Sequence, residues 1–270
     1  MTVQTLVVPR RFRGPATSGN GGWTSGALAQ LLAPAPVGLL GALGGLGVPV
    51  VSTPAAEVVR VRLSAPPPLE VPLIVTCDGP TAAAQHEGRP VLSAALLPGG
   101  RPDGLDAVPP VGYDAALAAG ERYRGLHDHP FPECFVCGPA RAPDDGLRLR
   151  PGPLDPAVPG VDVAAAWSPG PADVAADGTV PVPLVWAALD CPGGWSVDIV
   201  GRPMVLGTMT ARVLARPASG ERCVVTGRAV QVGDRKALTA TSLYGQTGNL
   251  LATAAHVWVA VDPSTFGRAE

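Results

Sequence analysis

The sequence predicts an α+β fold in which helices lie on antiparallel sheet. In the second half, a helical pattern at 182–191 precedes four strand-like runs, at 204–215, 222–232, 237–245 and 250–261. These runs are rich in β-branched residues, and the turn sequences PASGE, GDRK and QTGN separate them. Such turns are typical of antiparallel connections, and a helix followed by a meander of strands builds an α+β unit.

The first half repeats this order of elements. A strand near 5–12 precedes a helix at 21–33, for which Asn20 is the expected N-cap. Strand-like runs then follow at 57–66, 70–79, 81–88 and 90–98. The segment 60–79 can be aligned with 210–229, because each has an alternating strand, a proline-containing turn, an acid and a Val/Ile-rich strand. We therefore expect a duplicated unit, with halves at 1–105 and 161–270. The linker 106–160 contains a helix-like stretch at 113–126.

Composition excludes several functional classes. Of 270 residues, 46% are hydrophobic and 16% charged, which favours a large core over disorder. A net charge of -2 without a basic stripe argues against a nucleic-acid partner. The first residues lack the apolar core of a signal peptide, and five cysteines, an odd number, fit a reducing cytoplasm.

One uncharged stretch, 14–56, is long enough to cross a bilayer. Pro34, Pro36 and Pro49, together with many glycines, disfavour a continuous helix there. We expect no membrane span, but a short helix and then a glycine-rich loop.

Three stretches carry a resemblance to a known family. SGNGGWTSGALAQLL lies in the first half, CFVCGPARAPDDGLRLRPG before the second, and VWAALDCPGGW in the second helix. They resemble the hot-dog acyl-CoA thioesterases. The resemblance implies a tandem, or double, hot-dog in which each half is a curved antiparallel sheet wrapped round one helix. It also implies that acyl-CoA thioesters are hydrolysed at the seam between the halves, without a cofactor, in a chain that could form a homodimer.

The resemblance implies a site made of a glycine amide at one helix start and a carboxylate within the other helix. Asp190 is the candidate carboxylate. Eight residues before it lies Val182, followed by Pro183, which has no N–H to donate. The first helix has the donors, at Gly21 and Gly22, but no acid.

Two antiparallel helices can combine these parts, whereas one cannot, because eight residues span about 12 Å of helix. We expect Gly22, with Asn20, to polarise the thioester carbonyl, and Asp190 to activate water or attack directly. Gly21, Gln30 and Trp186 are further candidates for substrate binding. The opposite seam, Gln30 facing Val182, would be chemically inert.

Two alternatives stay open for Asp190 and for the function. Asp190 could cap a helix or pair with an arginine at an exposed helix end. The chain could also bind acyl thioesters or lipids without turnover. A hot-dog hydratase is disfavoured, because the histidine expected five residues after the acid is replaced by Trp195.

The stretch HDHPFPECFVC offers a candidate zinc site. His127, His129, Cys134 and Cys137 could supply four tetrahedral ligands. The alternative, and our main expectation, is no metal but a structural turn holding two reduced cysteines. We expect His256 to be a satisfied strand residue rather than a catalyst.

Overall fold

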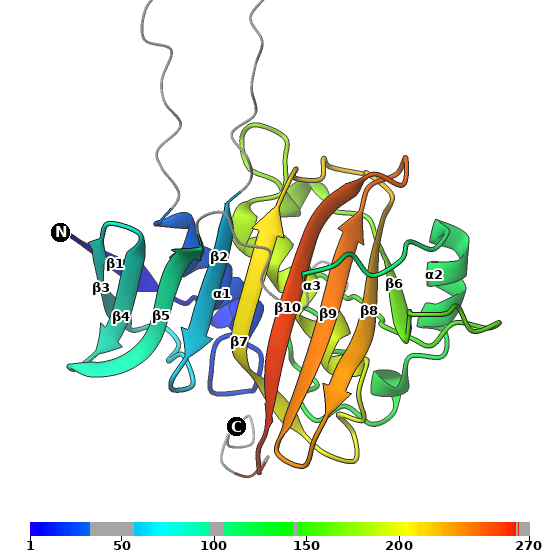
Figure 1. Cartoon of the computed structure of the whole chain (residues 1–270), viewed down its shortest axis with the longest axis horizontal. Coiled ribbons are helices and arrows are strands. Elements are labelled where there is room, and N and C mark those ends of the chain that lie inside the picture. The colour runs from blue at the N-terminus through cyan, green and yellow to red at the C-terminus, as the bar shows by residue number, and fades with distance from the viewer. Residues whose placement is uncertain (33–56, 98–104, 143–144, 263, 265–270) are drawn as a thin grey trace, which may run out of the picture.

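Ten strands form one continuous antiparallel sheet in the described part of the chain (Figure 1). A computed structural model describes residues 1–32, 57–97, 105–142, 145–262 and 264. Across the sheet the strands run β1-β3-β4-β5-β2-β7-β10-β9-β8-β6. Their bounds are β1 (Thr2–Val7), β2 (Val58–Leu63), β3 (Pro72–Asp78), β4 (Thr81–His86), β5 (Arg89–Leu97), β6 (Val163–Trp167), β7 (Met204–Val213), β8 (Cys223–Val232), β9 (Lys236–Tyr244) and β10 (Leu250–Ala260).

Three α-helices accompany this sheet among the described residues. They are α1 (Gly21–Gln30), α2 (Tyr113–Gly120) and α3 (Val182–Trp195), with short 3-10 turns at Arg10–Phe12, Arg124–Leu126 and Pro171–Asp173. The first and third helices lie side by side behind the sheet, whereas α2 packs beside β6 at its far edge (Figure 1). The main hydrophobic core fills the space between the sheet and these two central helices. The fold is therefore α+β, as predicted.

Each half of the chain contributes the same pattern of strand neighbours. From the centre outwards the first half runs β2-β5-β4-β3-β1, and the second runs β7-β10-β9-β8-β6. In both, one strand and one helix precede the four remaining strands along the chain, with α2 lying between the halves. The segments 60–79 and 210–229, aligned from sequence alone, span β2–β3 and β7–β8, which hold corresponding places in the two halves.

The two halves join where β2 pairs with β7. Val58 to Arg62 pair antiparallel with Arg212 to Thr208. Val61 and Met209, opposite each other, are fully buried. Since this pairing continues the ladder, the sheet has no break at its middle.

The second central helix is longer than the sequence predicted. We expected it to stop near Cys191, but α3 continues through Pro192 to Trp195. The two glycines there serve close packing on the sheet. A Cβ at Gly193 would lie 2.8 Å from Thr239 Oγ1, and one at Gly194 would lie 3.0 Å from the Trp258 ring. Glycine therefore lets the last turn approach β9 and β10 rather than ending the helix.

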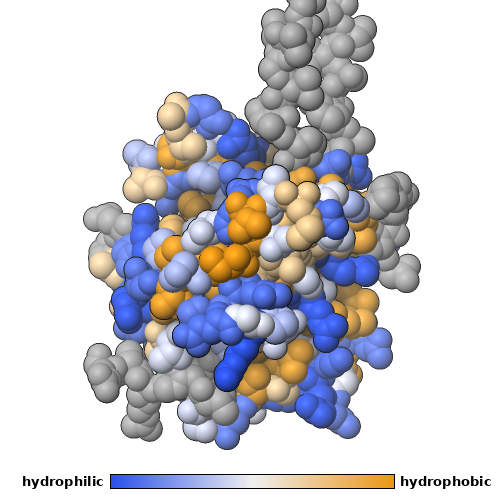
Figure 2. All heavy atoms as spheres, turned by 90° about the vertical axis from the view of Figure 1, so that its left-hand side faces the viewer, coloured by the Kyte–Doolittle hydropathy of each residue, from blue (hydrophilic) through white to orange (hydrophobic). Residues whose placement is uncertain are grey.

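The β1 edge of the sheet carries exposed apolar side chains among polar ones (Figure 2). Val3 is 69% exposed on β1, and Ile74 is 50% exposed on the neighbouring β3. A sheet edge has unpaired backbone groups that a second chain can join, but a homodimer stays a prediction.

The uncharged stretch that raised the question of a membrane falls mostly outside the described residues, in 33–56. Of the helices that are described, none combines the length and the apolarity needed to cross a bilayer.

Candidate active site

The two central helices touch through glycines on α1. The α1 glycines, Gly22 and Gly26, face α3 one turn apart: Gly22 meets Asp190 and the Trp186 carbonyl, and Gly26 meets Trp186 and Pro183. A Cβ at Gly22 would lie 2.5 Å from that of Asp190, and one at Gly26 2.7 Å from that of Trp186. As the contacts advance along α1 they move backwards along α3, so the helices are antiparallel. The predicted shared site requires this antiparallel arrangement.

Asp190 accepts two hydrogen bonds from the start of α1. Its Oδ2 lies 2.9 Å from the Gly22 backbone nitrogen and 2.9 Å from Asn20 Nδ2. Asn20 is also the N-cap, because its Oδ1 accepts the Trp23 N–H at 2.8 Å. One asparagine side chain therefore caps its own helix and binds the carboxylate of the other.

Burial governs the electrostatics of Asp190. The residue is 2% exposed, and desolvation raises its pKa to about 7, although the hydrogen bond from Gly22 acts in the opposite direction. Its second oxygen, Oδ1, has no hydrogen-bond partner among the described residues. Burial thus brings the pKa of Asp190 towards neutrality, with one oxygen hydrogen-bonded and the other buried without a partner among the described residues.

The sequence left open that Asp190 caps a helix or pairs with an arginine at an exposed helix end, and the position of Asp190 bears on both. The carboxylate is not at an exposed helix end, and no arginine bonds to it among the described residues. It does cap a helix, but the helix is α1 and not its own. The positive N-terminal end of α1 favours a negative charge there.

A cavity of about 280 Å³ opens beside this pair. Its wall includes Asn20, Gly21 and Asp190 from the helices, Leu206 from β7 and Trp258 from β10. The wall is mainly apolar with a few polar groups, as is typical of small-molecule sites.

Some of the predicted site residues line the cavity and others do not. Asn20, Gly21 and Asp190 line the cavity, and the Gly22 amide bonds to Asp190. Trp186 is 2% exposed in the contact between the helices, and Gln30 is exposed at the end of α1. Neither of these two lines the cavity, so the structure does not bring them to the site.

The amide donors bond to Asp190 in this structure, so their expected role towards the substrate carbonyl stays a prediction. We expected Gly22 and Asn20 to face the substrate carbonyl, whereas both donate to Asp190 Oδ2 in this structure. The physical reason is that a buried carboxylate must be hydrogen-bonded, and these donors are in reach.

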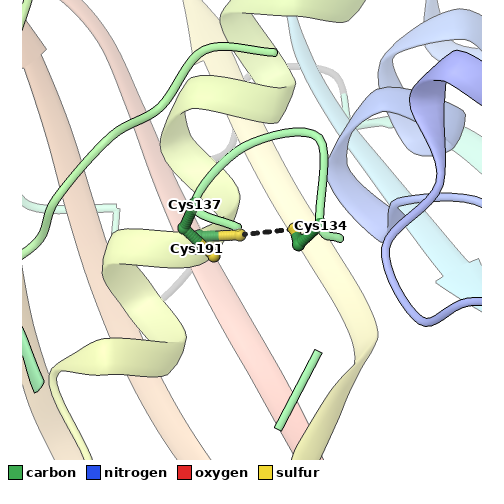
Figure 3. A group of neighbouring side chains, drawn as sticks. All are labelled: Cys134, Cys137 and Cys191. Carbon is green, nitrogen blue, oxygen red and sulfur yellow. Dashed lines mark hydrogen bonds between the residues drawn. The ribbon is translucent and has the colours of Figure 1, made fainter. Parts of the chain in front are cut away.

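Three cysteines form a buried cluster (Figure 3), and one of them, Cys191, directly follows Asp190 along α3. Cys134 and Cys137 come from the loop before the second half, and Cys191 comes from α3. The sulfur atoms all lie within 4.8 Å of one another, and those of Cys134 and Cys191 are 3.6 Å apart. The sequence reasoning missed Cys191; its position directly after Asp190 was the available signal.

The zinc alternative from the sequence used both histidines of this loop as ligands, but the described cluster consists of the three cysteines. His127 is exposed and is not part of the cluster. His129 Nε2 lies 3.3 Å from the Cys137 sulfur. Among the thiols, hydrogen bonds from Cys137 and Cys191 lower the pKa of Cys134, whereas burial raises the pKa of the other two.

Comparison with solved structures identifies the fold. A conserved protein from Alicyclobacillus acidocaldarius, whose function is unknown and whose fold is described as hot-dog, superposes over 97% of this chain and 94% of its own, with a TM-score of 0.57 and 16% identity. The chain has the hot-dog fold.

Two further solved structures cover nearly the whole chain. A TesB protein from Mycobacterium avium subsp. paratuberculosis has a TM-score of 0.56 at 11% identity, covering 96% of this chain and 93% of that one. A provisionally named thioesterase from Novosphingobium aromaticivorans has a TM-score of 0.58 at 15% identity, covering 96% of both. No protein-family model and no curated protein matches the sequence. At these low identities, the TM-scores and coverages show a shared fold alone.

Proposed function

We propose that this chain is a tandem pair of hot-dog units, 1–105 and 161–270 joined by 106–160, which hydrolyses acyl-CoA thioesters between its halves. The observation that carries the proposal is the buried Asp190 carboxylate on the N-terminal amides of α1, beside an apolar cavity. The repeated order of strands supports the tandem arrangement. The neighbour provisionally named as a thioesterase supports the reaction class.

The chemistry assigns one role to each side of the helix pair. The thioester oxygen takes over the hydrogen bonds that Gly22 and Asn20 donate to Oδ2, so that the amides stabilise the developing oxyanion. The displaced carboxylate removes a proton from water, and the water oxygen bonds to the carbonyl carbon. The tetrahedral intermediate then expels the CoA thiolate, which receives the proton from Asp190.

The exchange of hydrogen bonds strengthens the base when it is needed. The hydrogen bonds from Gly22 and Asn20 lower the pKa of Asp190. Once the thioester oxygen accepts them, the carboxylate loses that stabilisation and binds a proton more tightly. The same two donors therefore keep the resting site ordered and assist proton removal after substrate binds.

The decisive experiment measures thiol release from a panel of acyl-CoA esters. Asp190→Asn preserves shape and removes the base, so kcat/KM falls by about 100-fold or more. Asp234→Asn, at an exposed position, is the matched control and keeps wild-type activity. Circular dichroism and thermal unfolding establish that both variants are folded. Equal activity of Asp190→Asn and wild type would exclude Asp190 as the base.

One observation favours a second function, the binding of acyl thioesters without turnover. The donors needed for the oxyanion are occupied by Asp190 itself. If the wild type binds acyl-CoA in calorimetry but releases no thiol at any chain length, this second function replaces hydrolysis.

A further inference from the structure

The three clustered cysteines have a geometry suited to one metal ion. Zinc binds thiolate sulfur at about 2.3 Å in a tetrahedron, which places neighbouring sulfur atoms about 3.8 Å apart. The Cys134 and Cys191 sulfur atoms are 3.6 Å apart, and Cys137 completes a group whose members all lie within 4.8 Å. Each cysteine is buried, at 4% to 7% exposure. Three converging sulfur donors therefore need only small side-chain adjustments.

The loop that carries two of these sulfurs is held in place by its backbone. Gly138 N–H donates to the Cys134 carbonyl at 2.8 Å, and the Tyr123 hydroxyl donates to the Cys137 carbonyl at 3.0 Å. Gly138 permits this tight turn, because a Cβ there would lie 2.4 Å from the Pro132 carbonyl oxygen. A preformed turn lowers the entropy cost of binding an ion.

Two N–H groups already point to the sulfur atoms. Asn20 Nδ2 lies 3.9 Å from the Cys134 sulfur. His129 Nδ1 accepts the Phe131 N–H at 2.9 Å, so the ring proton lies on Nε2, which is 3.3 Å from the Cys137 sulfur. Donors placed at sulfur stabilise thiolate rather than thiol. They form the outer hydrogen bonds that metal-bound thiolates commonly have.

The same hydrogen bond excludes His129 as a ligand in this arrangement. For Nε2 to bind a metal, the ring proton would have to move to Nδ1, which faces the Phe131 N–H. The fourth position of the ion instead faces the cavity, since all three cysteines line it.

We propose that Cys134, Cys137 and Cys191 bind one zinc ion as thiolates, with the fourth position open to the cavity. Binding replaces three S–H bonds by three Zn–S bonds and releases three protons to solvent. The ion joins the loop to α3 at the residue after Asp190. This inference stands independently of hydrolysis, because it depends only on the sulfur and N–H geometry.

The test measures metal content and coordination in the full chain. The protein is produced with zinc supplementation, kept reduced, dialysed against zinc-free buffer and measured by plasma mass spectrometry. We expect about one zinc per wild-type chain, and less than a tenth for Cys134→Ala and Cys191→Ala. The matched control Cys223→Ala removes a buried cysteine outside the cluster and keeps the full content. His129→Ala keeps one zinc but binds it about 10- to 100-fold more weakly.

A second measurement uses the unmodified chain, so its result does not depend on whether the cysteine variants fold. Cobalt(II) added to chelator-treated, reduced wild type should give a thiolate-to-cobalt charge-transfer band, with X-ray absorption fitting three sulfur ligands. A reduced wild type with five countable thiols that takes up neither zinc nor cobalt would overturn the proposal. A fit of the X-ray absorption data with a histidine nitrogen bound to the cobalt would overturn the three-sulfur ligand set.

Discussion

The glycine contact between the two central helices makes a quantitative prediction for Gly26→Ala. The added methyl would lie 2.7 Å from Trp186 Cβ and 2.8 Å from Pro183 Cα, whereas carbon atoms are at ease at about 3.5–4.0 Å. Trp186 is 2% exposed and has little room to move. The helices must therefore separate by about 1 Å to reach ordinary contact.

Two opposing contributions set the size of the effect. Overpacking a filled core costs about 1–3 kcal/mol, and replacing glycine by alanine within a helix returns about 1 kcal/mol. We expect a net loss of about 0–2 kcal/mol in the free energy of unfolding. Activity should fall further, because Gly22 and Asp190 lie one turn away and a 1 Å misplacement can cost about 100-fold.

Urea unfolding and steady-state thiol release measure the two effects separately. Gly120→Ala is the matched control, because Gly120 ends α2 and its Cβ would meet Arg150 at an ordinary 3.4 Å. That variant should keep both stability and activity. A Gly26→Ala protein as stable and as active as wild type would refute the packing argument.

Three further changes probe the site and its support. Burial lowers the pKa of His256 to about 4, because the fold favours the neutral ring. The free energy of unfolding is therefore at its full value above pH 6.5 and decreases as the pH falls from 6.5 towards 4. Between pH 7 and 5 the unfolding free energy of wild type should fall by about 2 kcal/mol relative to His256→Gln, and a constant difference would contradict this. Asn20→Ser keeps a helix cap but loses the donor to Asp190, so kcat should fall about 100-fold at similar KM; a change in KM alone would count against an oxyanion role. Leu206→Ala shortens a side chain of the cavity wall, so the cavity becomes larger and the acyl preference should shift towards bulkier chains. Leu243 is also buried but does not line the cavity, so Leu243→Ala should lose similar stability without that shift.

The elements of the second half could be predicted because their patterns are local. The run expected at 250–261 is β10 at Leu250–Ala260, and turns bounded it clearly. The end of α3 could not be predicted in this way. Pro192, Gly193 and Gly194 have the composition of a helix stop, and only the nearness of β9 and β10 explains why the helix continues.

The site was predictable as a pairing of helices but not in its hydrogen bonds. The family resemblance implied a glycine amide and a carboxylate, and helix geometry indicated that these two groups come from different helices. In the structure Asp190 and Gly22 meet. Which acceptor receives the hydrogen bond from the Gly22 N–H depends on interatomic distances, which cannot be obtained from the sequence. Cys191 was missed for a related reason, since its partners lie far from it along the chain and a spacing motif covers only near neighbours.

The joining of both halves in one polypeptide has an evolutionary consequence. In a two-fold symmetric dimer every substitution appears twice, so both copies of a site gain or lose a group together. In a single chain, the position that carries Asp190 on α3 could change without any change at the corresponding position on α1. Under the proposed function, one end of the helix pair could then specialise for chemistry while the other end changed freely.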